Sequence, residues 1–382
     1  MMSTLERSLL WTIFGLFFLL LLTPFITAKT LFFPFITGKN FYFRIIVELM
    51  AGAWIALSVL NPEYRPRKSL LLYALSAFII VISAATLLGA DPYHSFWSNF
   101  ERMEGLVTHL HLFMLFLVLA HSIREQREWR MFLVFSIFVS LIVSMHGFLQ
   151  HVDGYNQILQ GSKFLQNIGF DPVIGSSRSY ARFGNSIYLA VYIMFHLFFL
   201  SIIFARSRKT WIHILCSVFF VFESFVFIQV ASRGAFIGFA SSIVFAVLLF
   251  IFTSESRSYR LAGLAVIFLV GIGASFVFLV PNNYFVKNLE LFQRLSDVSI
   301  RSASIDPSSM IWGVALKGVM ERPILGWGPE NFVLVFAKFY NPNIFGNESW
   351  FDRAHNMLLE WLVASGIIGL LSYFFIFASA IV

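Results

Sequence analysis

Residues 231–253 read ASRGAFIGFASSIVFAVLLFIFT, an arginine followed by a long apolar segment. An α-helix needs about 20 apolar residues to cross a lipid bilayer, and this segment supplies them. Hydrophobic residues make up 58% of the chain and charged residues only 12%, whereas a soluble domain has about 25% charged residues. We therefore expect the 382 residues to form one bundle of membrane helices, an all-α integral membrane protein.

The same hydropathy pattern recurs along the chain and predicts about ten crossings. The N-terminal run at 9–25 resembles a signal peptide, but it lacks a small-residue cleavage site and more membrane segments follow, so we expect a retained first helix. Because the sequence stops at Val382 within an apolar run, we expect it to be truncated at its C-terminus. The expected crossings are residues 8–28, 41–60, 69–90, 106–121, 131–150, 186–205, 210–230, 235–253, 261–281 and 355–376.

Basic residues orient the bundle, because short loops rich in Lys and Arg stay in the cytoplasm. Their position indicates that the net charge of +7 reflects topology rather than binding of nucleic acid. We expect a cytoplasmic N-terminus and an outer face formed by the long segments 91–105, 151–185 and 282–354. The basic residues of the short loops are Arg7, Arg65, Arg67, Lys68, Arg124, Arg127, Arg130, Arg206, Arg208, Lys209, Arg257 and Arg260.

Two parts of the chain are expected. Residues 1–185 would hold the N-terminal membrane helices with their outer loops. Residues 186–382 would form a core that includes the large outer loop 282–354.

The loop 282–354 is expected to contain helices of its own. Asp306 and Pro307 predict a helix start, with Asp as the N-cap and Pro at the first helical position, and Pro323 ends this helix. A second short helix is expected near Glu330. The residues predicted to form one apolar face of the first helix are Trp312, Ala315, Leu316, Val319 and Met320, and such a helix can lie on the membrane surface.

Arg233, expected at the end of the seventh crossing, and Arg182, just before the sixth, are candidate anion-binding residues on the outer face. An arginine beside a bilayer is costly, and its guanidinium can hold a phosphate with two hydrogen bonds. For both residues the alternative is an arginine that merely reaches toward the interface. Arg178 lies near Arg182 and could be the true partner, while Asn185 is suited to be the N-cap of the sixth crossing.

His355 is the candidate catalytic residue, at the N-terminal end of the last crossing. The helix dipole disfavours the charged imidazolium there, and a neutral imidazole is what a general base needs. The alternative is a buried structural histidine. Asn356 and Glu360 are candidate supporting residues. They share a helix face with each other, but Glu360 does not share one with His355.

Other polar residues carry weaker signals. Glu101 and Arg102 precede the fourth crossing and are candidates to support sugar or phosphate binding, with a local ion-pair cluster as the alternative. Glu223 in the seventh crossing is expected to be paired or protonated, and a proton relay stays open. Cys216 has no second cysteine, and the spacing of His109 and His111 makes a poor metal pair. We expect neither a metal nor a cofactor.

Three sequence elements appear in a fixed order: ASRGA at 231–235, RPILGWGPENF at 322–332, and AHN at 354–356, which is followed by Leu359-Glu360 and by SGIIG at 365–369. In these elements the chain resembles the superfamily of O-antigen ligases and Wzy-type O-antigen polymerases, which are glycosyltransferases of the bacterial envelope. RFGN at 182–185 is similar to an upstream arginine element of that family, although Ser186 stands where a proline is usual.

The resemblance implies a GT-C-like membrane enzyme that acts on the outer face of the bacterial plasma membrane without a metal ion. The donor would be a glycan linked to undecaprenyl diphosphate. Family roles would place Arg182 and Arg233 on the diphosphate and His355 on the acceptor hydroxyl, with membrane lipids as further partners.

The acceptor stays open at this stage. Ligases use a lipid A core sugar, polymerases use another carrier-linked glycan, and protein O-oligosaccharyltransferases use a protein hydroxyl. A transporter or flippase of lipid-linked sugars is the alternative from another class. Such proteins show inverted repeats or polar residues at the membrane midplane, and this sequence shows little of either beyond Glu223.

Overall fold

The computed structural model describes residues 2–151, 178–279, 290–292, 307–344 and 350–381. Every regular element in these ranges is a helix, so the predicted all-α class is confirmed. The chain forms two compact units, which are described separately below. Unit 1 contains residues 1–126 and 300–382, and unit 2 contains residues 127–299. The sequence analysis divides the chain between residues 185 and 186 instead, and that division stays a sequence-based proposal.

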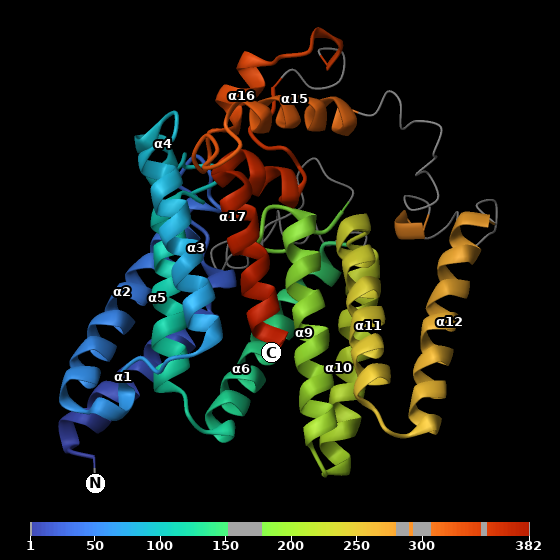
Figure 1. The fold of residues 1–382 in the computed structure, drawn as a ribbon. Helices are drawn as coiled ribbons and strands as arrows, with labels where there is room; N and C mark the ends of the chain where they lie inside the picture. Colours follow the sequence, from blue (N-terminus) through green and yellow to red (C-terminus); the bar gives the residue numbers. More distant parts are fainter. Residues whose placement is uncertain (1, 152–177, 280–289, 293–306, 345–349, 382) are drawn as a thin grey trace. The chain divides into compact units, whose positions relative to one another are not determined.

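Unit 1 is built from long helices that pack along one another and shorter helices at one end (Figure 1). α1 packs along α2, α2 packs against α5, and α3 lies along α17. The short α15 and α16 contact each other and α17. The helices are α1 (Thr4–Leu21), α2 (Thr37–Leu60), α3 (Leu70–Leu87), α4 (Pro92–Trp97), α5 (Leu106–Ser122), α15 (Pro307–Glu321), α16 (Phe332–Lys338) and α17 (Met357–Ile381).

Unit 2 contains the remaining long helices. α9 packs against both α10 and α11, and α11 also packs against α12. The helices are α6 (Gln126–Leu149), α9 (Ser186–Arg206), α10 (Thr210–Gln229), α11 (Arg233–Thr253) and α12 (Arg257–Leu279). Asn185 accepts a hydrogen bond from the Ile187 amide, so its predicted role as the N-cap of α9 is confirmed.

Buried polar residues join three helices of unit 2. Ser136 of α6 lies 2.8 Å from a ring nitrogen of His196 in α9. One turn further along α6, the Ser140 hydroxyl donates to Glu223 of α10 at 2.6 Å. Glu223 is fully buried. The sequence did not reveal its partner, and the structure shows that it is Ser140 of α6. These hydrogen bonds supply the polar contacts that an apolar bundle otherwise lacks.

Eight of the described helices are long and apolar enough to cross a membrane: α1, α2, α3, α6, α9, α10, α11 and α17. Each of the expected crossings coincides with a helix. The two outside the eight are α5, a shorter apolar helix of 17 residues, and α12, which has 23 residues. A multi-pass membrane protein is therefore confirmed, with eight spans by length and composition where the sequence predicted about ten.

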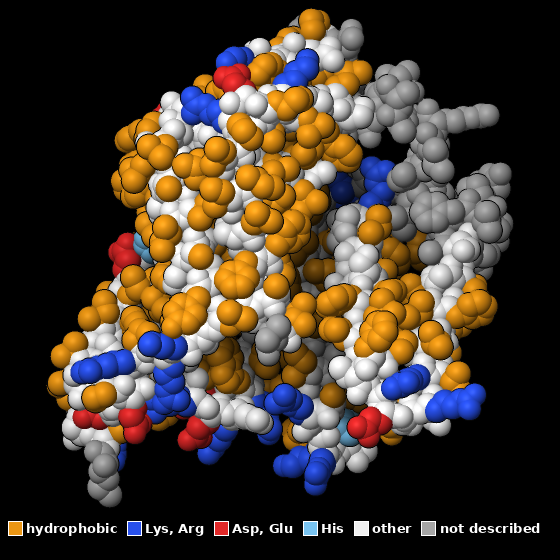
Figure 2. Space-filling view, viewed as in Figure 1, with side chains coloured by type: hydrophobic (Ala, Val, Ile, Leu, Met, Phe, Trp, Pro, Cys, Tyr) orange, Lys and Arg blue, Asp and Glu red, His pale blue; other side chains and the backbone are white. Residues whose placement is uncertain are grey.

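The basic loops of unit 1 meet at one end of its helices. Arg124, after α5, forms an ion pair with Glu63 in the loop between α2 and α3 at 2.8 Å. Asn61 of the same loop donates to Glu6 in the first turn of α1. On the face shown in Figure 2, hydrophobic side chains cover α3, with charged side chains near both ends of the unit. This pattern is typical of a helix bundle whose apolar middle faces lipid.

α15 starts at Pro307 as predicted, while Asp306 lies outside the described residues. The predicted apolar face is divided between the core and the surface. Its Trp312, Leu316 and Met320 are exposed, Met320 by 73%, whereas its Ala315 is buried and its Val319 packs against the core. Ile311 and Val314, which lie beside that face, are buried in the same core. Because α15 is apolar on two sides, its sequence did not reveal which side packs inward.

The turn at 326–328 docks on a kink in α17. Gly366 interrupts that helix with φ 64° and ψ −166°. The kink leaves backbone groups without partners within the helix, and the turn and the residues before it bind them. The bonds are Trp327 N to Val363 O at 2.8 Å, Gly328 N to Ala364 O at 2.9 Å and Ile367 N to Pro323 O at 2.9 Å.

Glycine is required on both sides of this contact. Gly326 and Gly366 have φ of 68° and 64°, in the left-handed region. A Cβ on Gly366 would overlap the carbonyl group of Ile324, and a Cβ on Gly326 would overlap the carbonyl oxygen of Val363. The glycines of the GWGP and SGIIG elements therefore allow two backbones to touch.

Replacing Gly366 by alanine should destabilise the protein by about 2–4 kcal/mol. The added Cβ is disfavoured at a residue with positive φ, and it would also overlap the carbonyl group of Ile324. The matched control is Gly313→Ala in α15, where a Cβ would meet nothing within 4 Å. That change should be neutral or slightly stabilising. Thermal unfolding of both variants in detergent, followed by tryptophan fluorescence, checks this. Equal unfolding temperatures for the two variants would contradict the role assigned to the kink.

Candidate active site

His355 stands just outside α17. The sequence placed it at the N-terminal end of that helix, as the first residue of the crossing 355–376, but the helix starts at Met357 and Asn356 caps it. The Asn356 Oδ1 accepts hydrogen bonds from the amides of Leu358 and Leu359 at 3.0 and 3.3 Å. His355 has φ 50° and an exposed side chain, so it is not the buried structural histidine that the sequence left open.

Arg353, two residues before His355, binds carboxylates from three parts of unit 1. Its guanidinium contacts Glu330 before α16, lies 2.9 Å from Glu104 before α5, and lies 4.0 Å from Glu360 in α17. Ser98 donates to the second oxygen of Glu330 at 2.6 Å. A charged group in a half-buried position is stabilised only when it is paired in this way.

Arg102 forms the second ion pair of this region. Its Nε and Nη2 donate to the two carboxylate oxygens of Asp352 at 2.7 and 3.0 Å, a two-pronged arrangement. The sequence left a local ion-pair cluster around Glu101 and Arg102 as an alternative. The pair is instead non-local, because its partners are 250 positions apart in the chain.

The backbone of the loop before α5 is held from α2. Arg44 is buried and donates to the carbonyl of Met103 at 3.3 Å and to the hydroxyl of Thr108 at 2.7 Å. Glu101 is half-buried and directly precedes Arg102. Arg44 therefore fixes the segment that presents Arg102 and Glu104 to residues 352 and 353.

Glu360 and Asn356 both serve the N-terminus of α17. Glu360 accepts a hydrogen bond from the Ala354 amide at 2.9 Å, in addition to its approach to Arg353. The sequence paired Asn356 and Glu360 on one helix face. In the structure both side chains bind backbone amides around His355, because helix N-termini leave such groups unsatisfied.

The pKa values of Asp352 and Arg353 are shifted in opposite directions. Burial tends to raise the pKa of Asp352, but the hydrogen bonds and charge of Arg102 outweigh it and the pKa lies below its usual value. Burial tends to lower the pKa of Arg353, but Glu330, Glu104 and Glu360 outweigh it and the pKa is raised. Both groups are therefore charged at neutral pH.

In unit 2, Arg182 is buried within a tight turn. The Gln150 side chain at the end of α6 accepts hydrogen bonds from the amides of Tyr180 and Ala181 at 3.2 and 2.8 Å, which fixes the backbone just before Arg182. Arg178 is half-buried at the start of the same loop.

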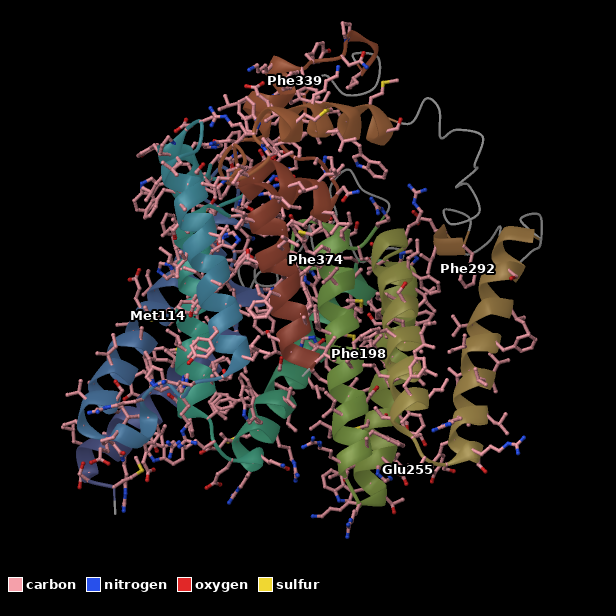
Figure 3. The ribbon with its side chains drawn as sticks, viewed as in Figure 1. Met114, Phe198, Glu255, Phe292, Phe339 and Phe374 are labelled. Atoms are coloured by element: carbon pink, nitrogen blue, oxygen red, sulfur yellow. The ribbon has the colours of Figure 1, made fainter. Side chains whose placement is uncertain are left out.

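Arg233 is the first residue of α11, with Ser232 at the N-cap, whereas the sequence placed it at the end of the preceding helix. Its side chain is exposed. Ala231 packs on Leu291, beside Phe236 and the Phe292 labelled in Figure 3. A cation at a helix N-terminus opposes the helix dipole, so an anion bound there interacts favourably with both.

α9 and α11 start at the same end of unit 2 (Figure 1). They pack against each other; Arg182 lies just before α9, and Arg233 is the first residue of α11. Arg182 and Arg233 therefore lie toward one end of unit 2. In unit 1, the ion pairs gather Arg102, Glu360 and Asn356 around the segment that carries His355.

Unusual backbone conformations coincide with these residues. Among the described residues, six that are not glycine have positive φ. Each conformation of this kind costs about 1–3 kcal/mol and is found mainly at functional sites. They are Ser98, Met103, Ala181, Ala231, Glu330 and His355, and each is a candidate site residue, binds one, or lies within two positions of one.

The sequence reasoning missed Asp352, Arg353 and Glu330 as parts of the site. An acid and a base directly before Ala354-His355 were a signal, because paired charges next to a functional motif often hold it in place. In the described part of the chain, no group of three His, Cys, Asp or Glu residues could hold a metal ion.

The O-antigen ligase family model matches residues 218–374. The superfamily predicted from the motifs is confirmed, and with it a membrane glycosyltransferase family of O-antigen and lipopolysaccharide biosynthesis. The matched residues include Arg233, His355, Asn356 and Glu360, whereas Glu101, Arg102, Arg178 and Arg182 precede them. A search of curated proteins finds no match.

Acid should weaken unit 1 through Asp352. The folded pKa of Asp352 lies below the unfolded value of about 3.9, so its stabilisation is complete above about pH 4 and is lost as the pH falls through the folded pKa. We expect Asp352→Asn to lower the unfolding temperature at pH 7 and to reduce the fall of the unfolding temperature below about pH 4.

The control is Glu321→Gln, which removes a more exposed ion pair with Lys338 and should change little. Thermal unfolding at a series of pH values measures both variants. The assignment is wrong if Asp352→Asn retains the pH dependence of the unaltered chain.

Proposed function

We propose that this protein transfers a glycan from an undecaprenyl-diphosphate carrier to an acceptor hydroxyl on the outer face of the bacterial plasma membrane. The observation that carries the proposal is the exposed His355, held in a left-handed conformation directly before the N-terminus of α17. The O-antigen ligase match over residues 218–374 supports the reaction class. The topology proposed with it has a cytoplasmic N-terminus.

In this reaction His355 accepts the proton of the acceptor hydroxyl. The hydroxyl oxygen then forms a bond to the anomeric carbon of the donor sugar, and the bond between that carbon and the diphosphate oxygen breaks. Undecaprenyl diphosphate leaves with the bonding electrons. The proposed role of Arg182 and Arg233 is to bind this diphosphate and stabilise the charge that develops on it. As proposed, the reaction needs neither a metal ion nor a cofactor.

The acceptor is proposed to be a sugar hydroxyl of a lipid A core, as in a ligase. A polymerase, which extends another carrier-linked glycan, and a protein O-oligosaccharyltransferase use the same chemistry. Separate assays with each acceptor distinguish them.

The exposed stripe of α15 is compatible with a lipid-linked donor. Trp312, Leu316 and Met320 follow one another at intervals of four residues and are exposed in unit 1. We propose that α15 lies on the membrane surface and helps admit the lipid.

Replacing His355 by alanine should lower turnover by about 10²–10⁴-fold, because general-base catalysis contributes that much. Donor binding should stay within about twofold, since the arginines bind the diphosphate. The matched control is His213→Ala, which removes a histidine that contacts the Ser207 carbonyl. Release of undecaprenyl diphosphate gives turnover, and binding of labelled donor gives affinity. Full turnover by His355→Ala would refute the catalytic assignment.

Replacing Arg233 by alanine should raise the donor KM by about tenfold or more, since a hydrogen bond to a charged group contributes about 1.5–3 kcal/mol. Lysine should restore part of this loss, because it keeps the charge but not the fork of donors. Arg257, the exposed first residue of α12, is the matched control, and Arg257→Ala should leave the donor KM unchanged. Equal KM values for the two alanine variants would exclude Arg233 from the donor site.

A further inference from the structure

The segment 351–354 directly before His355 is fixed at every position. Phe351 and Ala354 are buried in the core formed by α15, α16 and α17. Between them, Asp352 accepts hydrogen bonds from the guanidinium of Arg102, and Arg353 pairs with carboxylates from other parts of unit 1. His355 follows directly and its side chain is exposed, whereas the Ala354 before it is buried.

Arg353 holds together the parts of this arrangement. Glu104 comes from the loop before α5, Glu330 from the turn before α16 and Glu360 from the first turn of α17. Glu330 and His355 both have positive φ, with values of 66° and 50°. Such conformations persist only where the surroundings impose them, and Arg353 contacts one of these residues and lies two positions from the other.

Glu360 links the same cluster to the backbone next to His355. Its Oε2 accepts from the Ala354 amide at 2.9 Å, while its Oε1 lies 4.0 Å from Arg353. The orientation of the peptide bond before Ala354 is therefore coupled to the position of the guanidinium. Loss of Arg353 would leave three carboxylates close together, and their repulsion would move the elements apart.

We infer that Arg353 is a positioning residue, which sets the orientation of His355 through Glu104, Glu330 and Glu360. This inference rests on the proposed function for its catalytic consequence. Arg353 itself does not touch the reacting atoms in this scheme. A displacement of about 1 Å in a catalytic group can cost about 10²-fold in rate, which sets the scale of the expected effect.

The catalytic test uses the full-length protein and an undecaprenyl-diphosphate-linked oligosaccharide as the donor. Arg353→Ala should lower kcat by about 10–100-fold and change the donor KM by no more than about twofold. Arg353→Lys should recover part of the kcat, because one ammonium can neutralise but not bridge three carboxylates. Lys338→Ala removes the ion pair with Glu321 in the same unit and serves as the control, with kcat unchanged.

A double variant separates positioning from general destabilisation. If Arg353 acts through His355, then Arg353→Ala should have little further effect on the residual rate of a His355→Ala protein. Multiplicative losses in the double variant would overturn the inference, because they would show that Arg353 acts independently of His355.

Amide hydrogen exchange provides a readout that needs no substrate. Arg353→Ala should speed exchange in peptides covering 351–359, while peptides of α1 and α2 keep the exchange rates of the unaltered protein. Unchanged exchange in 351–359 would refute the anchoring role even if the rate falls. Faster exchange combined with an unaltered kcat would refute the positioning role. Absence of transfer by the unaltered protein, with faster exchange in the variant, would instead count against the proposed function.

Discussion

The contact between the turn at 326–328 and the kink of α17 is the constraint on which the rest of unit 1 depends. It joins two backbones directly, and glycines on both sides make the approach possible. The Trp327 carbonyl also accepts from the Ala90 amide after α3, so the turn links the end of α3 to α17. The Trp327 ring nitrogen donates to the Gly318 carbonyl of α15 at 2.9 Å. These hydrogen bonds hold α15 and the start of α17 together, and they place the segment that carries His355.

Ion pairs of Arg353 then connect the segment before His355 to the loop before α5 and to the turn before α16. A half-buried guanidinium needs its partners, and each partner here belongs to a different part of the chain. The arrangement stabilises backbone conformations that are otherwise costly, at Glu330 and at His355. Unit 2 shows a related principle, because Gln150 fixes the turn before Arg182 through two backbone amides. In both units, polar side chains hold a short loop that presents a candidate functional residue.

The sequence predicted what depends on local pattern and missed what depends on contacts between distant residues. The apolar runs located the helices, and the residue type of Asn185 predicted a cap that the structure confirms. The sequence predicted an apolar face on α15 but not which residues pack inward, because Ile311 and Val314 compete with Trp312 and Leu316 in hydrophobicity. The pairing of Arg102 with Asp352 could not be read from the sequence, since it depends on how α5 and α17 come together.

In the proposed reaction, this membrane protein performs glycosyl transfer with His355 as the base. The most direct measurement is release of undecaprenyl diphosphate from a carrier-linked oligosaccharide by the full-length protein, with lipid A core, carrier-linked glycan and protein acceptors offered separately. A glycosyltransferase should release the carrier only when one class of acceptor is present. Intact donor with every acceptor, together with movement of that lipid across vesicle membranes, would contradict glycosyl transfer and favour a flippase.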